Sequence, residues 1–248
     1  MGALVVDRIS VTHAAQYTTR IQRLHPAQIE PVLTAAPAGA TLDTGAQMSH
    51  IVLLGDSVFD NAVYCAPQPD VASHLRQIVG PRTAVSLLAV DGSITSEVSG
   101  QLNDVPDAAT DLVISSGGND ALSHQGLLDL PVDRVARALS AFDEPLRRFG
   151  VDYRALLDQA SRTGLRITVC TIYNGNLAPE IAVAARIAVA LFNDIIQRAA
   201  HEVGAAVIEL RAVCNSQEHY ANPIEPSGSG GANIARAIAD VLRVRAAR

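Results

Sequence analysis

A serine closely follows the first strongly apolar run of the chain, within the segment Gly55-Asp56-Ser57. The glycine two positions before Ser57 indicates a tight turn from a strand into a helix, a place where a nucleophile can be presented. A serine that opens a helix also lies beside backbone N–H groups without intrahelical acceptors, and these groups can stabilise an oxyanion. Taken alone, Ser57 is more simply interpreted as a helix N-cap, so the other loops must decide between the two roles.

Two further loops carry groups that can bind a developing negative charge. Gly92 lies in the loop Asp91-Gly92-Ser93, and Asn119 lies in the loop Gly117-Gly118-Asn119-Asp120. The Gly92 N–H can approach a substrate oxygen closely because glycine has no side chain, and the Asn119 amide donates without adding charge. A serine, a glycine N–H and an asparagine amide after successive strands are the groups that acyl transfer requires.

The elements that position these loops alternate along the chain from residue 50 onward. Near-continuous apolar runs predict strands at Ile51–Leu54, Ala84–Val90, Leu112–Ser115, Arg166–Ile172 and Ala206–Leu210. Helical patterns predict helices at Asp70–Val79, Pro131–Phe149, Val151–Arg162, Pro179–Val203 and Gly228–Val244. This order predicts an α/β fold, a doubly wound parallel sheet of five strands in three α/β/α layers. Ligands of such sheets bind at the carboxyl ends of the strands, where the three loops lie.

From about residue 50 to its end, the sequence resembles the SGNH or GDSL-type hydrolases, a family of esterases, lipases and acyltransferases. Gly55-Asp56-Ser57 matches the family's GDS block, which implies that Ser57 is the nucleophile. Gly92 matches the glycine of the second block, and Asn119 matches the asparagine of the third block. The resemblance implies a flavodoxin-like SGNH hydrolase fold. It also implies an oxyanion hole formed by the N–H groups of Ser57 and Gly92 and by the Asn119 amide.

The fourth block of the family is changed in this sequence. Asn222 stands where the family has an orienting aspartate, and Glu225 stands where it has the histidine base. One interpretation is that the base is lost, because an ordinary glutamate, with a pKa of about 4.3, is a poor partner for a serine hydroxyl. The other is a Ser57–Glu225 dyad, in which burial raises the pKa of Glu225 to about 6–7 and the neutral Asn222 amide orients the carboxylate.

A histidine displaced from its usual position is the third possibility for the base. His219 is the first alternative, because it lies in the same predicted loop as Glu225. His124 and His50 also lie near predicted strand ends or starts, and an ordinary surface role is the default for each of them.

The composition narrows the classes of partner. The chain has 248 residues, 48% of them hydrophobic, and a net charge of −6. No basic cluster provides the footprint that nucleic acids or anionic membranes need. The most apolar stretch, Ile181–Phe192, is interrupted by Arg186 and is shorter than the roughly 18 apolar residues of a membrane span. Since neither a nucleotide-binding loop nor a metal-ligand cluster occurs, we expect no cofactor and no metal. The sequence does not specify an oligomeric state.

Cysteine usage and the N-terminal sequence predict the compartment. Cys65, Cys170 and Cys214 are odd in number and lack CxxC spacing, which favours a reducing environment and buried thiols. Residues 1–20 lack the apolar run of a secretory signal, so we predict a cytoplasmic location. Residues 1–47 form a predicted arm or leader, rich in Ala, Pro, Gly and Thr in its second half, before a domain over residues 48–248. A docked N-terminal extension is the alternative.

The sequence therefore predicts a hydrolase that cleaves small-molecule carboxylic esters through an acyl-serine intermediate at Ser57. Glu225 is the expected proton carrier, with Asn222 as its orienting partner. Two alternatives stay open: an acyltransferase of the same fold, and a non-catalytic domain that binds an acylated ligand.

Overall fold

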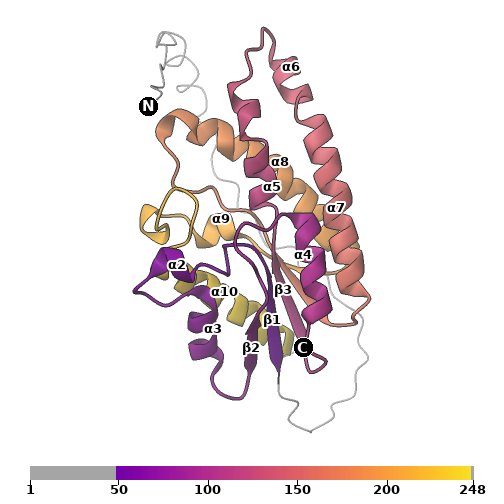
Figure 1. Cartoon of the computed structure of the whole chain (residues 1–248), viewed down its shortest axis with the longest axis vertical. Helices are drawn as coiled ribbons and strands as arrows, with labels where there is room; N and C mark the ends of the chain where they lie inside the picture. The colour runs from indigo at the N-terminus through magenta and orange to yellow at the C-terminus, as the bar shows by residue number, and fades with distance from the viewer. Residues whose placement is uncertain (1–48, 247–248) are drawn as a thin grey trace. The chain divides into compact units, whose positions relative to one another are not determined.

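The computed structural model describes residues 49–246, so the arm predicted over residues 1–47 lies outside the described residues. The described chain forms a five-stranded parallel sheet in the order β2-β1-β3-β4-β5 (Figure 1). The strands are β1 (His50–Gly55), β2 (Ala84–Leu87), β3 (Asp111–Ser115), β4 (Arg166–Cys170) and β5 (Ala206–Ile208). The predicted doubly wound architecture is confirmed.

Helices connect the strands and cover both faces of the sheet (Figure 1). The longer ones are α3 (Val71–Val79), α4 (Thr95–Gln101), α7 (Asp143–Ser161), α8 (Pro179–Glu202) and α10 (Gly228–Ala246). Shorter ones are α2 (Ala62–Cys65), α5 (Gly118–Ser123), α6 (Val135–Ser140) and α9 (Leu210–Val213). Single 3₁₀ turns occur at η1 (Leu102–Asp104), η2 (Gln125–Asp129) and η3 (Gln217–His219).

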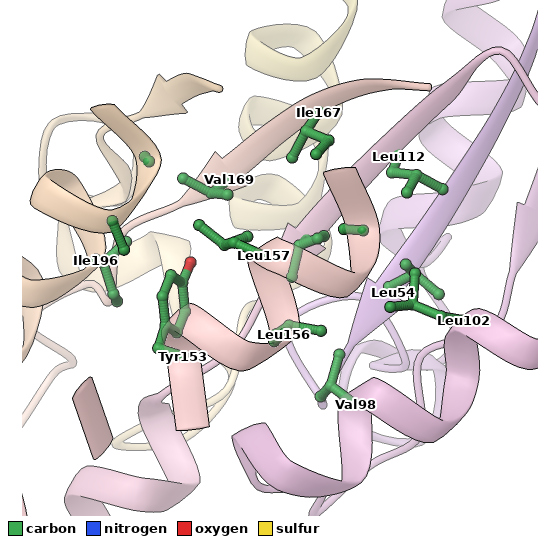
Figure 2. Close-up of a cluster of buried hydrophobic side chains, with 14 of the residues drawn as sticks. Leu54, Val98, Leu102, Leu112, Tyr153, Leu156, Leu157, Ile167, Val169 and Ile196 are labelled. Atoms are coloured by element: carbon green, nitrogen blue, oxygen red, sulfur yellow. The ribbon is translucent and has the colours of Figure 1, made fainter. Parts of the chain in front are cut away.

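Alternating side chains of the strands build a separate core on each face. Val52 and Leu54 of β1 pack on one face with residues of α4, α7 and α8 (Figure 2). Ile51 and Leu53 pack on the other face with residues of α3 and α10. All four side chains are at most 2% exposed, so β1 is covered on both sides. This burial explains why its sequence is an uninterrupted apolar run.

Several element boundaries differ from those predicted. The predicted strands ending at Val90, Ile172 and Leu210 stop two or three residues earlier. After β2, Leu88 and Ala89 still pack inside whereas Val90 is exposed. The N–H groups of residues 88 and 89 both donate to the Leu53 carbonyl, which breaks the regular ladder. Leu210 is fully buried as the first residue of α9 rather than as the end of a strand.

The helical region after β3 is also divided differently from the prediction. The break falls between α6 and α7, near residue 141, and Gly150 lies inside α7. A side chain at Gly150 would contact Ile195 of α8, so the glycine lies where the two helices approach each other. The predicted helix starting at Pro131 begins at Val135 instead. Helices α4 and α5 were not predicted.

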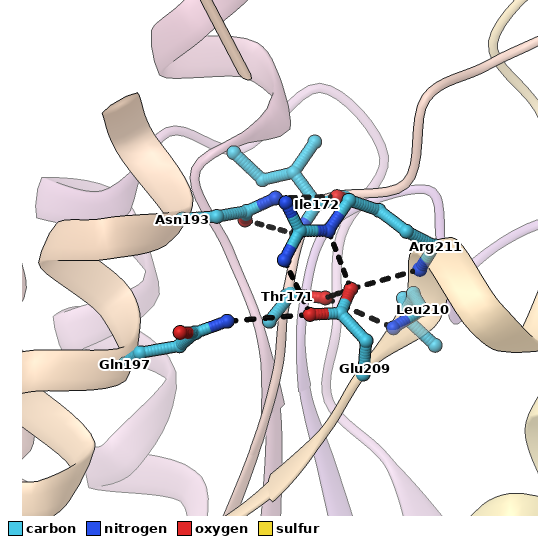
Figure 3. Close-up of polar contacts among 7 residues, drawn as sticks. All are labelled: Thr171, Ile172, Asn193, Gln197, Glu209, Leu210 and Arg211. Atoms are coloured by element: carbon cyan, nitrogen blue, oxygen red, sulfur yellow. Dashed lines mark hydrogen bonds and ion pairs between the residues drawn. The ribbon is translucent and has the colours of Figure 1, made fainter. Parts of the chain in front are cut away.

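Polar side chains tie α8 to the carboxyl ends of β4 and β5 (Figure 3). The buried Asn193 side chain accepts from the Ile172 N–H at 2.7 Å and donates to the Ile172 carbonyl at 2.8 Å. Thr171 donates to Glu209 at 2.7 Å, and Arg211 also binds Glu209. These bonds fix the segment after β4 against α8, and this segment borders the candidate site.

The three cysteines, Cys65, Cys170 and Cys214, are buried and free of disulfides. Burial is what the sequence predicts for them. None of the helices within residues 49–246 is long and apolar enough to cross a membrane.

Candidate active site

The turn that carries Ser57 depends on Gly55 at the end of β1. Gly55 has a φ of +138°, and a Cβ at this position would lie 1.8 Å from the Ser115 carbonyl oxygen of β3. A side chain here would therefore force β1 and β3 apart. The glycine of the GDS motif is explained by this close approach of two backbones.

Ser57 does not open a helix, and this corrects the prediction. It lies in a turn in which the Asp56 carbonyl accepts from the N–H groups of Phe59 and Asp60, while the Asp56 carboxylate accepts from the Val58 N–H. Asp56 thus provides the acceptors that a helix would otherwise provide. Helix α2 begins only at residue 62. The Ser57 N–H is not among the donors that Asp56 uses.

Gln101 of α4 fixes the same turn from the opposite side. Its side chain accepts from the Gly55 N–H and donates to the Gly55 carbonyl, both at 2.8 Å. Gly55 and Gln101 are both buried, so these bonds satisfy backbone groups that have no access to water; the Gly55 carbonyl also accepts from the Val90 N–H. Gln101 was missed in the sequence because α4 was not predicted.

The loops after β2 and β3 meet beside this turn. The Asn119 amide, in the first turn of α5, donates to the Ser93 carbonyl at 3.0 Å. Asp120 accepts from the backbone N–H and the hydroxyl of Thr95. Gly92 lies in the same β2 loop but is exposed, and it faces a second, open hollow rather than the cavity described below. Ser57 and Asn119 therefore share a cavity that Gly92 does not line.

Glu225 is held in place through the backbone around it. The Asn222 side-chain oxygen accepts from the N–H groups of Ile224 and Glu225, at 2.9 and 2.8 Å. The Tyr173 hydroxyl donates to the Ile224 carbonyl at 2.6 Å, and the buried Asn61 amide donates to the Pro226 carbonyl at 3.3 Å. The Asn222 oxygen thus binds this backbone, which differs from the predicted contact with the Glu225 carboxylate.

The Glu225 carboxyl group lies in a nearly closed environment. The residue is 6% exposed, and its Oε2 has no hydrogen-bond partner within the described chain. Burial raises the pKa of Glu225, the Ser57 hydroxyl lowers it by hydrogen bonding to the carboxylate, and the charge of Asp91 raises it again. The net shift of the pKa is upward. A carboxylate of this kind is more basic than one in water.

A second carboxyl group lies close to Glu225. Asp56 is 3% exposed, and burial, together with the charges of Glu225 and Asp120, raises its pKa from 3.8 to about 7 against the bond from the Val58 N–H. Two buried carboxylates close together disfavour joint ionisation. Near neutral pH the Asp56 carboxyl is therefore partly protonated.

A cavity of about 580 Å³ brings most of the predicted residues together. Ser57, Asn119, Asn222 and Glu225 all contribute to its wall, as does Tyr173 from the loop after β4. This volume lies in the range of sites for small organic ligands. Nowhere in residues 49–246 do three or more His, Cys, Asp or Glu side chains gather in a way that could hold a metal ion.

The histidines considered as alternative bases lie in three different places. The His219 ring accepts from the Ser216 N–H and lies 3.0 Å from the Asn233 amide of α10, and His219 does not line the cavity. His50 is the first residue of β1 and contacts Ser86 of β2, so it lies at the opposite end of β1 from Ser57. His124 does line the cavity, at the end of α5.

Comparison with known families gives a match over most of the chain. The model of the GDSL-like lipase/acylhydrolase family matches residues 53–230, which is well over half of the chain. The chain belongs to this family. The match includes Ser57, Gly92, Asn119 and Glu225, and it confirms the predicted resemblance. No curated protein matches the sequence.

Solved structures of the GDSL-like fold show the same architecture. An extracellular lipase from Streptomyces rimosus has a TM-score of 0.58 at 16% identity, covering 77% of this chain and 99% of its own. A phospholipase A1 from Streptomyces albidoflavus has a TM-score of 0.57 at 15% identity, with 78% and 99% covered. An acetyl xylan esterase has a TM-score of 0.58 at 13% identity, with 77% and 98% covered. At these identities the likeness shows the fold, and the cytoplasmic location stays a prediction.

The clamp on Gly55 generates the first prediction. Gln101→Leu keeps the side-chain size but leaves the Gly55 N–H buried without a partner, whereas the Gly55 carbonyl still accepts from the Val90 N–H. We expect urea denaturation to show a loss of about 1–3 kcal/mol in unfolding free energy, the cost of one unpaired buried donor. Gln159→Leu is the matched control, because Gln159 makes a single 3.4 Å bond to the Ser99 carbonyl. Equal losses in the two variants would contradict the assigned role of Gln101.

The raised pKa of Asp56 generates the second prediction. Unfolded Asp56 releases its proton near pH 3.8 and folded Asp56 near pH 7, so folding retains a proton between these values. The free energy of unfolding should therefore fall as pH rises through this window, because the folded state binds more protons. Asp56→Asn keeps an acceptor for the Val58 N–H and removes the titration. Between pH 4 and 7 the unfolding free energy should decrease in both proteins, and the decrease in Asp56→Asn should be smaller than that in the parent by about 2–4 kcal/mol. Parallel stability curves would exclude the titration of Asp56.

Proposed function

We propose that this protein is a carboxylic ester hydrolase in which Ser57 is the nucleophile and Glu225 the general base. The observation that carries the proposal is the pairing of the two groups. Glu225 is buried in the same cavity as Ser57, interacts with its hydroxyl, and has a free carboxylate oxygen. A buried, unpaired carboxylate is costly, so its position beside a serine in a ligand-sized cavity indicates a chemical role.

In the proposed reaction, the Ser57 oxygen attacks the ester carbonyl carbon while its proton passes to the Glu225 carboxylate. The bond to the alkoxy group then breaks, and Glu225 returns the proton to the leaving alcohol. Water next attacks the acyl carbon and gives a proton to Glu225, which passes it to the Ser57 oxygen as the acid leaves. Glu225 is unchanged at the end of the cycle, and neither a cofactor nor a metal takes part in these steps.

The negative charge on the carbonyl oxygen requires donors. We propose the Ser57 N–H and the Asn119 amide for this role, and not the predicted Gly92 N–H, because Gly92 does not line the cavity. The Asn119 amide lies in the cavity wall, and its bond to the Ser93 carbonyl holds it in a fixed orientation, which is what an oxyanion donor requires. Ser93 follows Gly92 directly, so the same bond also connects the Gly92 loop to the site.

Asn222 has a positioning role in this proposal. Its side-chain oxygen binds the backbone of the turn that ends at Glu225, so it orients the carboxylate through the main chain. Together with Tyr173 and Asn61 it leaves the turn little freedom. A base held in this way need not be ordered during the reaction, which lowers the entropic cost of proton transfer.

The test of the proposal is the third prediction, which concerns Glu225→Gln. This variant keeps the shape of the side chain and removes the base, so the kcat for nitrophenyl acetate should fall by about 10²–10⁴ with little change in KM. In the parent protein, activity should rise with pH and then level off, because Glu225 must lose its proton to act and its pKa is raised.

The control is Glu218→Gln, which changes the same type of side chain at an exposed position of the same loop. It should retain the parent's activity and pH profile. His219→Ala tests whether His219, rather than Glu225, is the base. If His219→Ala abolishes turnover and Glu225→Gln does not, a displaced histidine carries the proton. If the parent itself turns over no ester, the domain binds an acylated ligand without reacting.

A further inference from the structure

The cavity extends well beyond the reacting groups along one face of α8. Ile181, Ala185, Ala188 and Phe192 of this helix line it, at a spacing of four, three and four residues. This spacing places all four side chains on one helical face. From the first to the last, the helix advances by about 16 Å. The face is entirely apolar, and its two alanines leave room in the middle of the wall.

The opposite wall is apolar as well. Leu122 of α5, Leu128 of η2 and Phe142, just before α7, line it. Two polar side chains, His124 and Gln125, lie among them. A carbohydrate would need a wall rich in hydrogen-bonding groups. This wall is mainly apolar, and its contact with a hydrocarbon ligand is favourable because both surfaces are removed from water.

The charges in the cavity exclude one group of esters. Its only ionisable acids are Asp56 and Glu225, and none of the described Lys or Arg side chains lines it. A substrate that carries a phosphate or another anionic group would therefore meet like charge and find no cationic partner. The wall favours an ester whose acyl part is hydrocarbon and whose alcohol part is not anionic.

The α8 wall is fixed with respect to the nucleophile. Asn193, one residue beyond Phe192, binds both backbone groups of Ile172, which itself lines the cavity after β4 (Figure 3). Strand β4 pairs with β3, and β3 pairs with β1, which ends at the Ser57 turn. A chain bound along α8 would therefore be held at a constant distance from the Ser57 hydroxyl.

We propose that the substrate is an ester of a medium or long unbranched acyl chain, which lies along the Ile181–Phe192 face of α8. Ala188 is then a determinant of chain length, because a larger side chain there would fill the middle of the wall. The hydrocarbon core of a bilayer is roughly 30 Å thick, so one extended acyl chain spans about half of that thickness. The face of α8, about 16 Å long, is close to this length. The inference rests on the proposed ester hydrolysis at Ser57.

The fourth prediction measures kcat/KM for the nitrophenyl esters of acetate, butyrate, octanoate and dodecanoate. In the parent protein kcat/KM should rise with chain length, by up to about fourfold for each added methylene, until the wall is covered. In Ala188→Phe the ratio of the octanoate value to the acetate value should fall at least about tenfold, since the longer chain no longer fits. Ala188→Leu repeats the test with a smaller enlargement in case the phenylalanine disturbs folding.

Ala190→Phe is the matched control, because Ala190 lies on the same helix, is exposed, and does not line the cavity. It should leave the ratio as in the parent. A parent protein that prefers acetate, or equal ratios in the Ala188 and Ala190 variants, would overturn the inference while leaving ester hydrolysis in place.

Binding separates this inference from the proposed chemistry. Calorimetry should show that methyl dodecanoate binds the Ser57→Ala protein. In the double variant that also carries Ala188→Phe, the affinity should be at least about tenfold weaker. If the ester binds in this way but the parent does not hydrolyse it, the acyl site stands and the proposed reaction fails. Absence of binding would overturn the acyl site.

Discussion

Burial of the Glu225 carboxyl beside Ser57 is the constraint on which the site depends. An ionised carboxylate taken out of water is strongly unfavourable unless it is paired, and no cation of the described chain pairs with Glu225. The same burial raises its pKa and so makes it able to accept a proton from serine. The fold must supply enough stability elsewhere to hold this group in place.

Hydrogen bonds to the backbone hold the turns on both sides of the Ser57–Glu225 pair. On one side, Gln101 satisfies both backbone groups of Gly55, and the absence of a side chain at Gly55 lets β1 and β3 approach each other. On the other side, Asn222, Tyr173 and Asn61 bind the turn around Glu225. Both reacting side chains therefore lie on hydrogen-bonded turns, which favours catalysis by preorganised groups.

Much of this arrangement could be predicted from the sequence because it depends on local patterns. Strands covered on both faces read as apolar runs, and Ser57 and Asn119 follow two of them directly. Glu225 could be predicted because the spacing of its loop matches the fourth block of the family. The end of the nucleophile turn could not, because Asp56 takes over hydrogen bonds that a helix normally makes.

The contacts that hold the site were missed for two physical reasons. Gln101 lies 46 residues from its partner Gly55, and Asn61 lies 165 residues from Pro226, so no local pattern connects them. Helix α4 is seven residues long and Val98 is its single large apolar residue, which is too little to show a helical period. The apolar face of α8 was visible as a run, yet its role as a cavity wall depends on the opposite elements.

The most direct test of the account is the labelling of the protein with a fluorophosphonate, followed by intact mass and peptide mapping. A Ser57–Glu225 pair predicts one adduct per chain, located on Ser57, that forms more slowly in the Glu225→Gln protein by about 10²–10⁴ because the base is missing. The same labelling rate in the parent and in Glu225→Gln, or an adduct on a residue other than Ser57, would contradict a Ser57–Glu225 pair.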